Sequence, residues 1–154
     1  MFEIGKKLPE FSLTDQTEKE KSFKDIAGEN GLVIYVYPKD NTSGCTLEAL
    51  DFRDRMDAFH RLGYGVAGLS KDSVKSHCNF AGKYDLNFPL LSDTSTDYIQ
   101  ALGAWGEKNM YGKKSMGVIR TTVIADGRGK VIRVYPKVKV KGHVEQVLAD
   151  LAGL

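Results

Sequence analysis

The 154-residue sequence contains only two cysteines, Cys45 and Cys78, which are too few for a disulfide framework. It also lacks an excess of charge of one sign. With 22 Lys and Arg against 20 Asp and Glu, the net charge of +2 gives no general reason to bind nucleic acid or an anionic membrane. Its apolar runs are far shorter than a bilayer span, and residues 1–7 have no apolar core typical of a signal peptide. These absences predict a reducing, cytoplasmic setting, in which a cysteine can be kept for its reactivity.

The apolar content is sufficient for a folded core. Hydrophobic residues make up 42% of the chain and charged residues 27%, a composition that excludes intrinsic disorder. The 16 glycines are scattered and show no period. Because no linker or repeat divides the sequence, we expect residues 1–154 to form a single domain.

Strand and helix patterns alternate along the chain. Residues 32–37 are continuously apolar and rich in β-branched and aromatic side chains, which predicts a strand buried on both faces of a sheet. Ala49, Phe52, Met56 and Phe59 recur at helical spacing, which predicts a helix over residues 45–62. The other predicted elements are strands at 11–14, 22–24, 66–69, 88–91, 121–125 and 131–135, helices at 72–84, 96–103 and 143–151, and a loop at 105–116. This order predicts an α/β fold with a mixed central sheet and helices on both faces.

Cys45 lies where the strand at 32–37 gives way to a helix. The free amide groups of a first helical turn and the positive end of the helix dipole favour an anion, so this position favours a thiolate. The hydroxyl of Thr42 could donate to the sulfur, Gly44 lets the backbone come close to a docked molecule, and Pro38 would limit access by water. The position alone leaves several thiol chemistries open.

Other site classes fit the sequence less well. A cysteine hydrolase needs a histidine partner, but His60 would lie roughly 22 Å along the helix from Cys45 at ~1.5 Å per residue. His77 and His143 stay open as partners, although we expect both to be solvated helix residues. No Cys or His pair has metal-ligand spacing apart from the adjacent His77 and Cys78. The C-x-x-C motif of a general disulfide oxidoreductase is missing.

The segment from Pro38 to Phe52, P-K-D-N-T-S-G-C-T-x-E-x-x-D-F, resembles the active-site segment of the peroxiredoxins. Within them it is similar to the bacterioferritin comigratory protein (peroxiredoxin Q) group. The similarity covers nearly the whole chain, including W-G-E-K at 105–108 and R-T-T at 120–122. The resemblance implies a thioredoxin-like fold with an N-terminal β extension, a monomer, and a thiol peroxidase activity that needs neither haem nor metal.

The resemblance also implies a role for each matching residue. Cys45 would be the peroxidatic cysteine, Thr42 would contact thiolate and peroxide, and Pro38 would shield the sulfur. Arg120 would favour the thiolate and hold the peroxide oxygens. The planar, always-charged guanidinium group of an arginine suits this role better than the ammonium group of a lysine. Glu48 matches the position that orients this arginine. Without the resemblance, Arg120 is typical of a solvated strand-end charge and Glu48 of an exposed helix carboxylate.

The chain departs from the family pattern at two positions. Ser43 stands where relatives usually have proline, which should loosen the loop. Leu50 stands where many relatives carry the resolving cysteine, so the other thiol, Cys78, is the candidate, close to where another branch of the family keeps it. Val74, Cys78 and Ala81 also form a possible core-facing stripe, in which Cys78 would only pack.

The family mechanism gives the expected reaction sequence. Cys45 would reduce hydrogen peroxide or an organic hydroperoxide and become a sulfenic acid. Cys78 would condense with it, and a thioredoxin- or glutaredoxin-like reductant would reduce the disulfide. Because a disulfide needs Cα atoms within roughly 7 Å, we expect local unwinding around one or both cysteines. The alternatives are a one-cysteine peroxidase resolved by an external thiol, or a non-enzymatic redox-sensing or chaperone-like protein that uses Cys45 as a switch.

Overall fold

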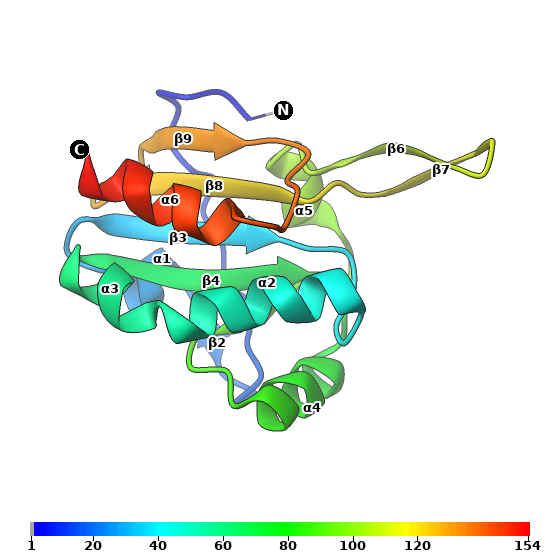
Figure 1. The fold of residues 1–154 in the computed structure, drawn as a ribbon, viewed down its shortest axis with the longest axis horizontal. Helices are drawn as coiled ribbons and strands as arrows, with labels where there is room; N and C mark the ends of the chain where they lie inside the picture. Colours follow the sequence, from blue (N-terminus) through cyan, green and yellow to red (C-terminus); the bar gives the residue numbers. More distant parts are fainter. Residues whose placement is uncertain (1) are drawn as a thin grey trace.

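A seven-stranded mixed sheet forms the centre of the computed structural model, which describes residues 2–154 (Figure 1). The strand order is β2-β1-β5-β4-β3-β8-β9. Strands β3, β4 and β5 are parallel, whereas β8 and β9 on one side and β1 and β2 on the other pair in antiparallel fashion. The strands are β1 (Leu13–Thr14), β2 (Glu20–Lys21), β3 (Gly31–Val36), β4 (Tyr64–Ser70), β5 (Leu90–Ser92), β8 (Thr121–Asp126) and β9 (Val131–Tyr135).

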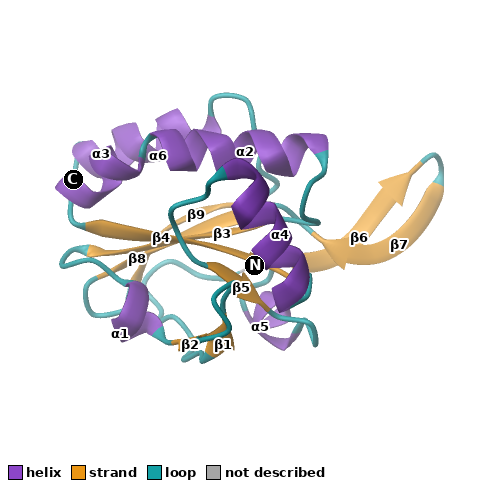
Figure 2. Ribbon diagram, turned by 90° about the horizontal axis from the view of Figure 1, so that it is seen from below, coloured by secondary structure: helices purple, strands orange, loops and turns teal. Residues whose placement is uncertain are grey.

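Helices cover both faces of this sheet. In Figure 2, α2, α3 and α6 lie together on one face, α1 and α5 lie on the other, and α4 lies beside β5. The helices are α1 (Phe23–Ile26), α2 (Ser43–Asp54), α3 (Met56–Arg61), α4 (Val74–Tyr84), α5 (Asp97–Ala101) and α6 (His143–Ala152). The predicted α/β class, with a mixed sheet between two helical layers and β1–β2 as an N-terminal extension, is confirmed.

The position of β3 inside the sheet explains why its sequence is apolar throughout. Val33 and Tyr35 point into the core beneath α2 and α6, whereas Leu32, Ile34 and Val36 point into the core on the opposite face. The ring of Tyr35 stacks on Phe52 of α2 at 4.5 Å between centroids. Because the two sides of β3 are buried at the same time, the strand holds α2, and with it Cys45, in a fixed position.

Two predicted elements are wrong in detail. The strand expected at 22–24 is absent, because β2 ends at Lys21 and Ser22 caps α1 through a bond from its N–H to the Asp25 carboxylate at 2.8 Å. The helix expected at 45–62 is two helices, α2 and α3, divided at Arg55, whose backbone is not helical. The Ser22-x-x-Asp25 capping box is the sequence pattern that indicates a helix, and not a strand, at this position.

The loop expected at 105–116 is a two-stranded hairpin, β6 (Trp105–Met110) and β7 (Lys113–Val118), which projects away from the sheet (Figure 1). Its two-residue turn, Tyr111 and Gly112, has positive φ at both positions, as a type I′ turn requires. At the base of the hairpin, the ammonium group of Lys71 lies 5.9 Å from the centre of the Trp105 ring. The pattern was missed because most side chains of β7 are exposed and give no apolar alternation.

The close approach of α1 to β4 requires a glycine. A Cβ at Gly65 would lie 2.0 Å from the carbonyl oxygen of Ile26. We expect Gly65→Ala to lower the free energy of unfolding by about 2–3 kcal/mol, because backbone must shift to admit the methyl group. Gly82→Ala is the matched control, because a Cβ at this exposed position of α4 meets nothing within 4 Å. This substitution should raise the free energy of unfolding by about 0.5–1 kcal/mol. Urea unfolding followed by circular dichroism measures both, and equal stabilities would contradict the packing.

Candidate active site

The connection between β3 and α2 delivers a buried thiol to the start of a helix. Pro38 follows the strand, Thr42 is the N-cap in an extended conformation, and Cys45 lies in the first turn of α2. Cys45 is a free thiol with 1% of its surface exposed. A Cβ at Gly44 would lie 3.4 Å from a guanidinium nitrogen of Arg120, so this glycine leaves room for the arginine beside the sulfur.

Arg120 bridges the thiol and a carboxylate of the same helix. Its Nη2 donates to Cys45 Sγ at 3.3 Å, and its Nη1 donates to Glu48 Oε1 at 2.6 Å. Burial alone would lower the pKa of Arg120, but the charges of Glu48 and Cys45 outweigh it and raise the pKa. The structure therefore brings together Cys45, Glu48 and Arg120, three of the residues that the sequence predicts for the site. The reading of Arg120 as a solvated strand-end charge is wrong, because only 16% of its side chain is exposed.

Glu48 is fully buried, so its reading as an exposed helix carboxylate is also wrong. Burial raises the pKa of Glu48 to about 7, although the neighbouring Arg120 acts to lower it. Its second oxygen, Oε2, has no hydrogen-bond partner within the part of the chain that the structure describes. Near neutral pH the carboxyl group therefore exchanges a proton, and the charge opposite Arg120 depends on pH.

Thr42 and Pro38 border the site without bonding to the sulfur. The hydroxyl of Thr42 is exposed and donates to the carbonyl oxygen of Lys39 at 2.9 Å. Among residues 2–154, the side-chain hydrogen bond that reaches the sulfur comes from Arg120. Pro38 is half-buried. A contact of Thr42 with thiolate or peroxide would need its hydroxyl to turn from Lys39.

Cys78 lies on the exposed side of α4, so its reading as a core-facing residue is wrong. The buried face of α4 instead carries His77 and Phe80, with Ala81 and Tyr84 half-buried behind them. Both cysteines are free thiols, one buried and one exposed. They are not joined in this conformation.

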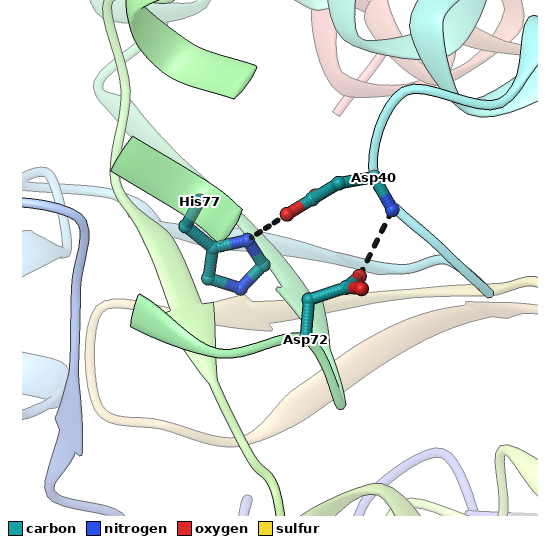
Figure 3. Close-up of side chains that lie close together, drawn as sticks. All are labelled: Asp40, Asp72 and His77. Carbon is teal, nitrogen blue, oxygen red and sulfur yellow. Dashed lines mark hydrogen bonds and ion pairs between the residues drawn. The ribbon is translucent and has the colours of Figure 1, made fainter. Parts of the chain in front are cut away.

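The expectation of solvated histidines is wrong for both His77 and His143, which are buried. His77 Nδ1 lies 2.7 Å from Asp40 Oδ2, and its Nε2 lies 3.0 Å from the carbonyl oxygen of Leu91 (Figure 3). His143 Nε2 lies 2.8 Å from the hydroxyl of Thr122, and burial lowers the pKa of His143 to about 4. Neither ring is hydrogen-bonded to Cys45 among the described residues, so a hydrolase-type Cys–His pair is not formed. The helical spacing of His77 with Phe80 and Tyr84 could have indicated its burial.

Asp40, Asp72 and His77 are the one group in the described chain whose side-chain atoms lie close enough to hold a metal ion, all within 4.8 Å. The atoms that would face the ion already have protein partners. Both nitrogens of His77 have protein partners, and Asp72 Oδ2 accepts from the hydroxyl of Ser70 at 2.7 Å and from the N–H of Asp40 at 2.9 Å. The cluster is an internal hydrogen-bond network and does not fit a metal centre.

Comparison with known proteins decides the family. The AhpC/TSA family model matches residues 4–134. The chain belongs to the AhpC/TSA family. This peroxiredoxin is 48% identical over 120 residues to peroxiredoxin Bcp of Xanthomonas campestris, covering 78% of this chain and 75% of the relative. It is 40% identical over 149 residues to peroxiredoxin Bcp of Bacillus subtilis, covering 97% and 94%.

Solved structures agree with the sequence comparison. The bacterioferritin comigratory protein of Xanthomonas campestris superposes with a TM-score of 0.86 at 41% identity, covering 93% of this chain and 90% of that one. Peroxiredoxin Q of Xylella fastidiosa superposes with a TM-score of 0.92 at 34% identity, covering 99% and 97%. This peroxiredoxin therefore has the thioredoxin-like fold and is a thiol peroxidase of the Bcp/peroxiredoxin Q group, as its sequence implied.

The buried carboxyl of Glu48 gives the fold a pH dependence. Since its pKa rises from an ordinary 4.5 to about 7, the native state binds this proton more tightly than the unfolded state. Its stabilising contribution is full below about pH 4.5 and is lost as the pH rises through 7. We expect the free energy of unfolding of the wild type, minus that of Glu48→Gln, to be smaller at pH 8 than at pH 5 in urea titrations. Exposed Glu10→Gln is the control, and a difference that does not change with pH would contradict the assignment.

Proposed function

We propose that Cys45 is the residue that reduces hydrogen peroxide and organic hydroperoxides in this thiol peroxidase. The observation that carries this assignment is the bridge from Arg120 to Cys45 Sγ and Glu48 Oε1, at 3.3 and 2.6 Å. A cation held 3.3 Å from the sulfur at a helix N-terminus favours the thiolate, which is the nucleophile. The alkyl peroxide reduction activity of the Xanthomonas campestris relative supports including organic hydroperoxides as substrates.

In the first half-reaction, the Cys45 thiolate attacks the terminal oxygen of the hydroperoxide. A sulfur–oxygen bond forms, the oxygen–oxygen bond breaks, and the departing hydroxide or alkoxide takes a proton to leave as water or alcohol. Cys45 is oxidised to a sulfenic acid. Arg120 and the amide groups of the first turn of α2 stabilise the charge that moves onto the departing oxygen, and Thr42 adds a hydroxyl donor once it leaves Lys39. Pro38 keeps water from one side of the sulfur.

In the second half-reaction, the Cys78 thiol condenses with the Cys45 sulfenic acid, which forms a disulfide and releases water. A thioredoxin- or glutaredoxin-like dithiol then reduces this disulfide by exchange. The exposure of Cys78 on α4 supports this role, because an exposed thiol can be presented without unpacking its own side chain. Leu50, which stands where many relatives carry the resolving cysteine, has no thiol and cannot form this disulfide. Since Cys45 is buried, the first turn of α2 or the middle of α4 must unwind to bring the two Cα atoms within roughly 7 Å.

The proposed setting is the cytoplasm, with the protein acting as a monomer on small peroxides. None of the helices in residues 2–154 has both the length and the apolar character needed to cross a bilayer. The near-neutral net charge of +2 supports a small substrate chosen by local contacts rather than a polyanionic partner.

The roles of the two thiols are separated by serine variants. We expect Cys45→Ser to abolish thioredoxin-coupled peroxide consumption, because the nucleophile is lost. Cys78→Ser should keep the first turnover and lose the coupled steady state, since no disulfide can form. Mass spectrometry after one equivalent of peroxide should show a Cys45–Cys78 disulfide in the wild type. Turnover that survives Cys45→Ser would refute the catalytic assignment, and a persistent sulfenic acid with free Cys78 would indicate the one-cysteine mechanism.

The planar fork of Arg120 is tested by Arg120→Lys. A single ammonium group cannot keep the geometry of two bonds to Cys45 and Glu48, so we expect the second-order rate constant with hydrogen peroxide to fall about 100-fold. Arg128→Lys, in the exposed turn between β8 and β9, is the matched control and should leave the rate unchanged. Competition kinetics against a reference peroxidase measures both, and a fall of less than threefold in Arg120→Lys would remove the arginine from the chemical step.

A further inference from the structure

Asp40 connects the active-site loop to the helix that carries Cys78. It lies in the loop between β3 and α2 and is 7% exposed. Its Oδ1 accepts from the hydroxyl of Tyr37 at 2.6 Å, and its Oδ2 accepts from the hydroxyl of Ser76 at 2.8 Å and lies 2.7 Å from His77 Nδ1. Figure 3 shows the carboxylate pointing at the His77 ring and the Asp40 N–H pointing at Asp72. Ser76 and His77 immediately precede Cys78.

The contacts of His77 hold its ring between two acceptor groups. One ring nitrogen faces the Asp40 carboxylate and the other faces the carbonyl oxygen of Leu91, and both of these groups only accept hydrogen bonds. Both nitrogens therefore face acceptors, and none of the His77 surface is exposed. Burial acts to raise the pKa of Asp40, but its bond to His77 and the charge of the ring outweigh burial and lower it. The two residues form a buried ion pair.

The neighbouring residue of the loop holds the other end of α4. Asn41 Oδ1 accepts from Lys83 Nζ at 3.3 Å and from the hydroxyl of Tyr84 at 3.2 Å. Asp40 and Asn41 thus contact the first turn and the last turn of α4. The loop that leads to Cys45 and the helix that carries Cys78 are therefore joined at both ends of the helix while the two thiols are free.

We propose that the Asp40–His77 ion pair is a clasp whose opening sets how fast Cys78 reaches the Cys45 sulfenic acid. This inference rests on the proposed function, in which Cys78 is the resolving thiol. Cys78 follows His77 directly in α4, so Cys78 cannot travel towards α2 unless His77 leaves its buried place between Asp40 and Leu91. Parting a buried ion pair is costly, which makes this opening slow.

The clasp also decides what else happens to the sulfenic acid. While it is closed, a second hydroperoxide can react with Cys45, converting the sulfenic acid to a sulfinic acid and leaving as water or alcohol. Opening of the clasp allows the condensation with Cys78 that prevents this loss. Asp40 and His77 are therefore positioning residues for the resolving step, and they set the balance between recycling and overoxidation.

Two single variants and their combination test the clasp. Asp40→Asn removes the negative charge with little change of shape, and His77→Gln removes the cation. Reduced protein is mixed with one equivalent of hydrogen peroxide, quenched at intervals by acid and alkylation, and analysed by mass spectrometry for sulfenic acid and disulfide separately. We expect each variant to form the Cys45–Cys78 disulfide at least threefold faster than the wild type, and to give less sulfinic acid in excess peroxide. Glu145→Gln, which breaks the exposed ion pair with Arg55, is the control and should leave both readouts unchanged.

The double variant shows whether the two residues act as a pair. Because both substitutions remove the same interaction, the double variant should be no faster than the faster single variant. Disulfide formation that is unchanged or slower in the single variants overturns the clasp, and so does a fully additive acceleration. A wild type that forms no Cys45–Cys78 disulfide overturns the proposed resolving role instead, which distinguishes the two failures.

Hydrogen exchange tests the clasp without any substitution. In the reduced wild type, the amide of Asp40 and the amides of α4 should exchange through one common opening, while those of β3 and β4 exchange more slowly. Independent exchange of Asp40 and α4 would overturn the proposal. In the single variants, the amides of α4 should exchange faster with β3 and β4 unaffected, a pattern that general destabilisation of the fold would not produce.

Discussion

The guanidinium group of Arg120 is the constraint on which the site depends. One planar cation lies between the sulfur of Cys45 and the carboxylate of Glu48, two groups one helical turn apart on α2. This arrangement works only if α2 is fixed against the sheet, and the stacking of Tyr35 on Phe52 provides that fixation. The core beneath α2 therefore helps to hold the candidate site together, because a small rotation of α2 would separate the sulfur from the cation.

Glu48 gives this arrangement an electrostatic weakness. A fully buried carboxyl with one oxygen that has no partner among residues 2–154 costs stability when it is charged, yet its charge is what holds Arg120 in place. The protein thus keeps a buried ion pair beside the sulfur of Cys45. Buried carboxyl groups with a shifted pKa cluster at functional sites.

Local signals in the sequence predicted the parts of the structure that depend on neighbouring residues. Short segments of sequence are enough to predict the apolar strand β3, the helical spacing after Cys45 and the turn between β8 and β9. The burial of Glu48 depends on Arg120, 72 residues away, and that of His77 depends on Asp40, 37 residues away. No pattern within α2 or α4 alone specifies those partners. The β6–β7 hairpin escaped prediction for a different reason, since its exposed side chains carry no alternation and only the Tyr111–Gly112 turn marks it.

The contact between Lys71 and Trp105 has a practical consequence. Trp105 is the only tryptophan of the chain, and Lys71 stands between the end of β4 and Asp72, whose carboxylate accepts from the N–H of Asp40. The intrinsic tryptophan emission of the protein therefore comes from one ring, and that ring is connected through two residues to the loop that precedes Cys45. Any movement of this loop that reaches Lys71 would change the surroundings of a single natural fluorophore, which makes Trp105 an intrinsic probe of the loop without an added label.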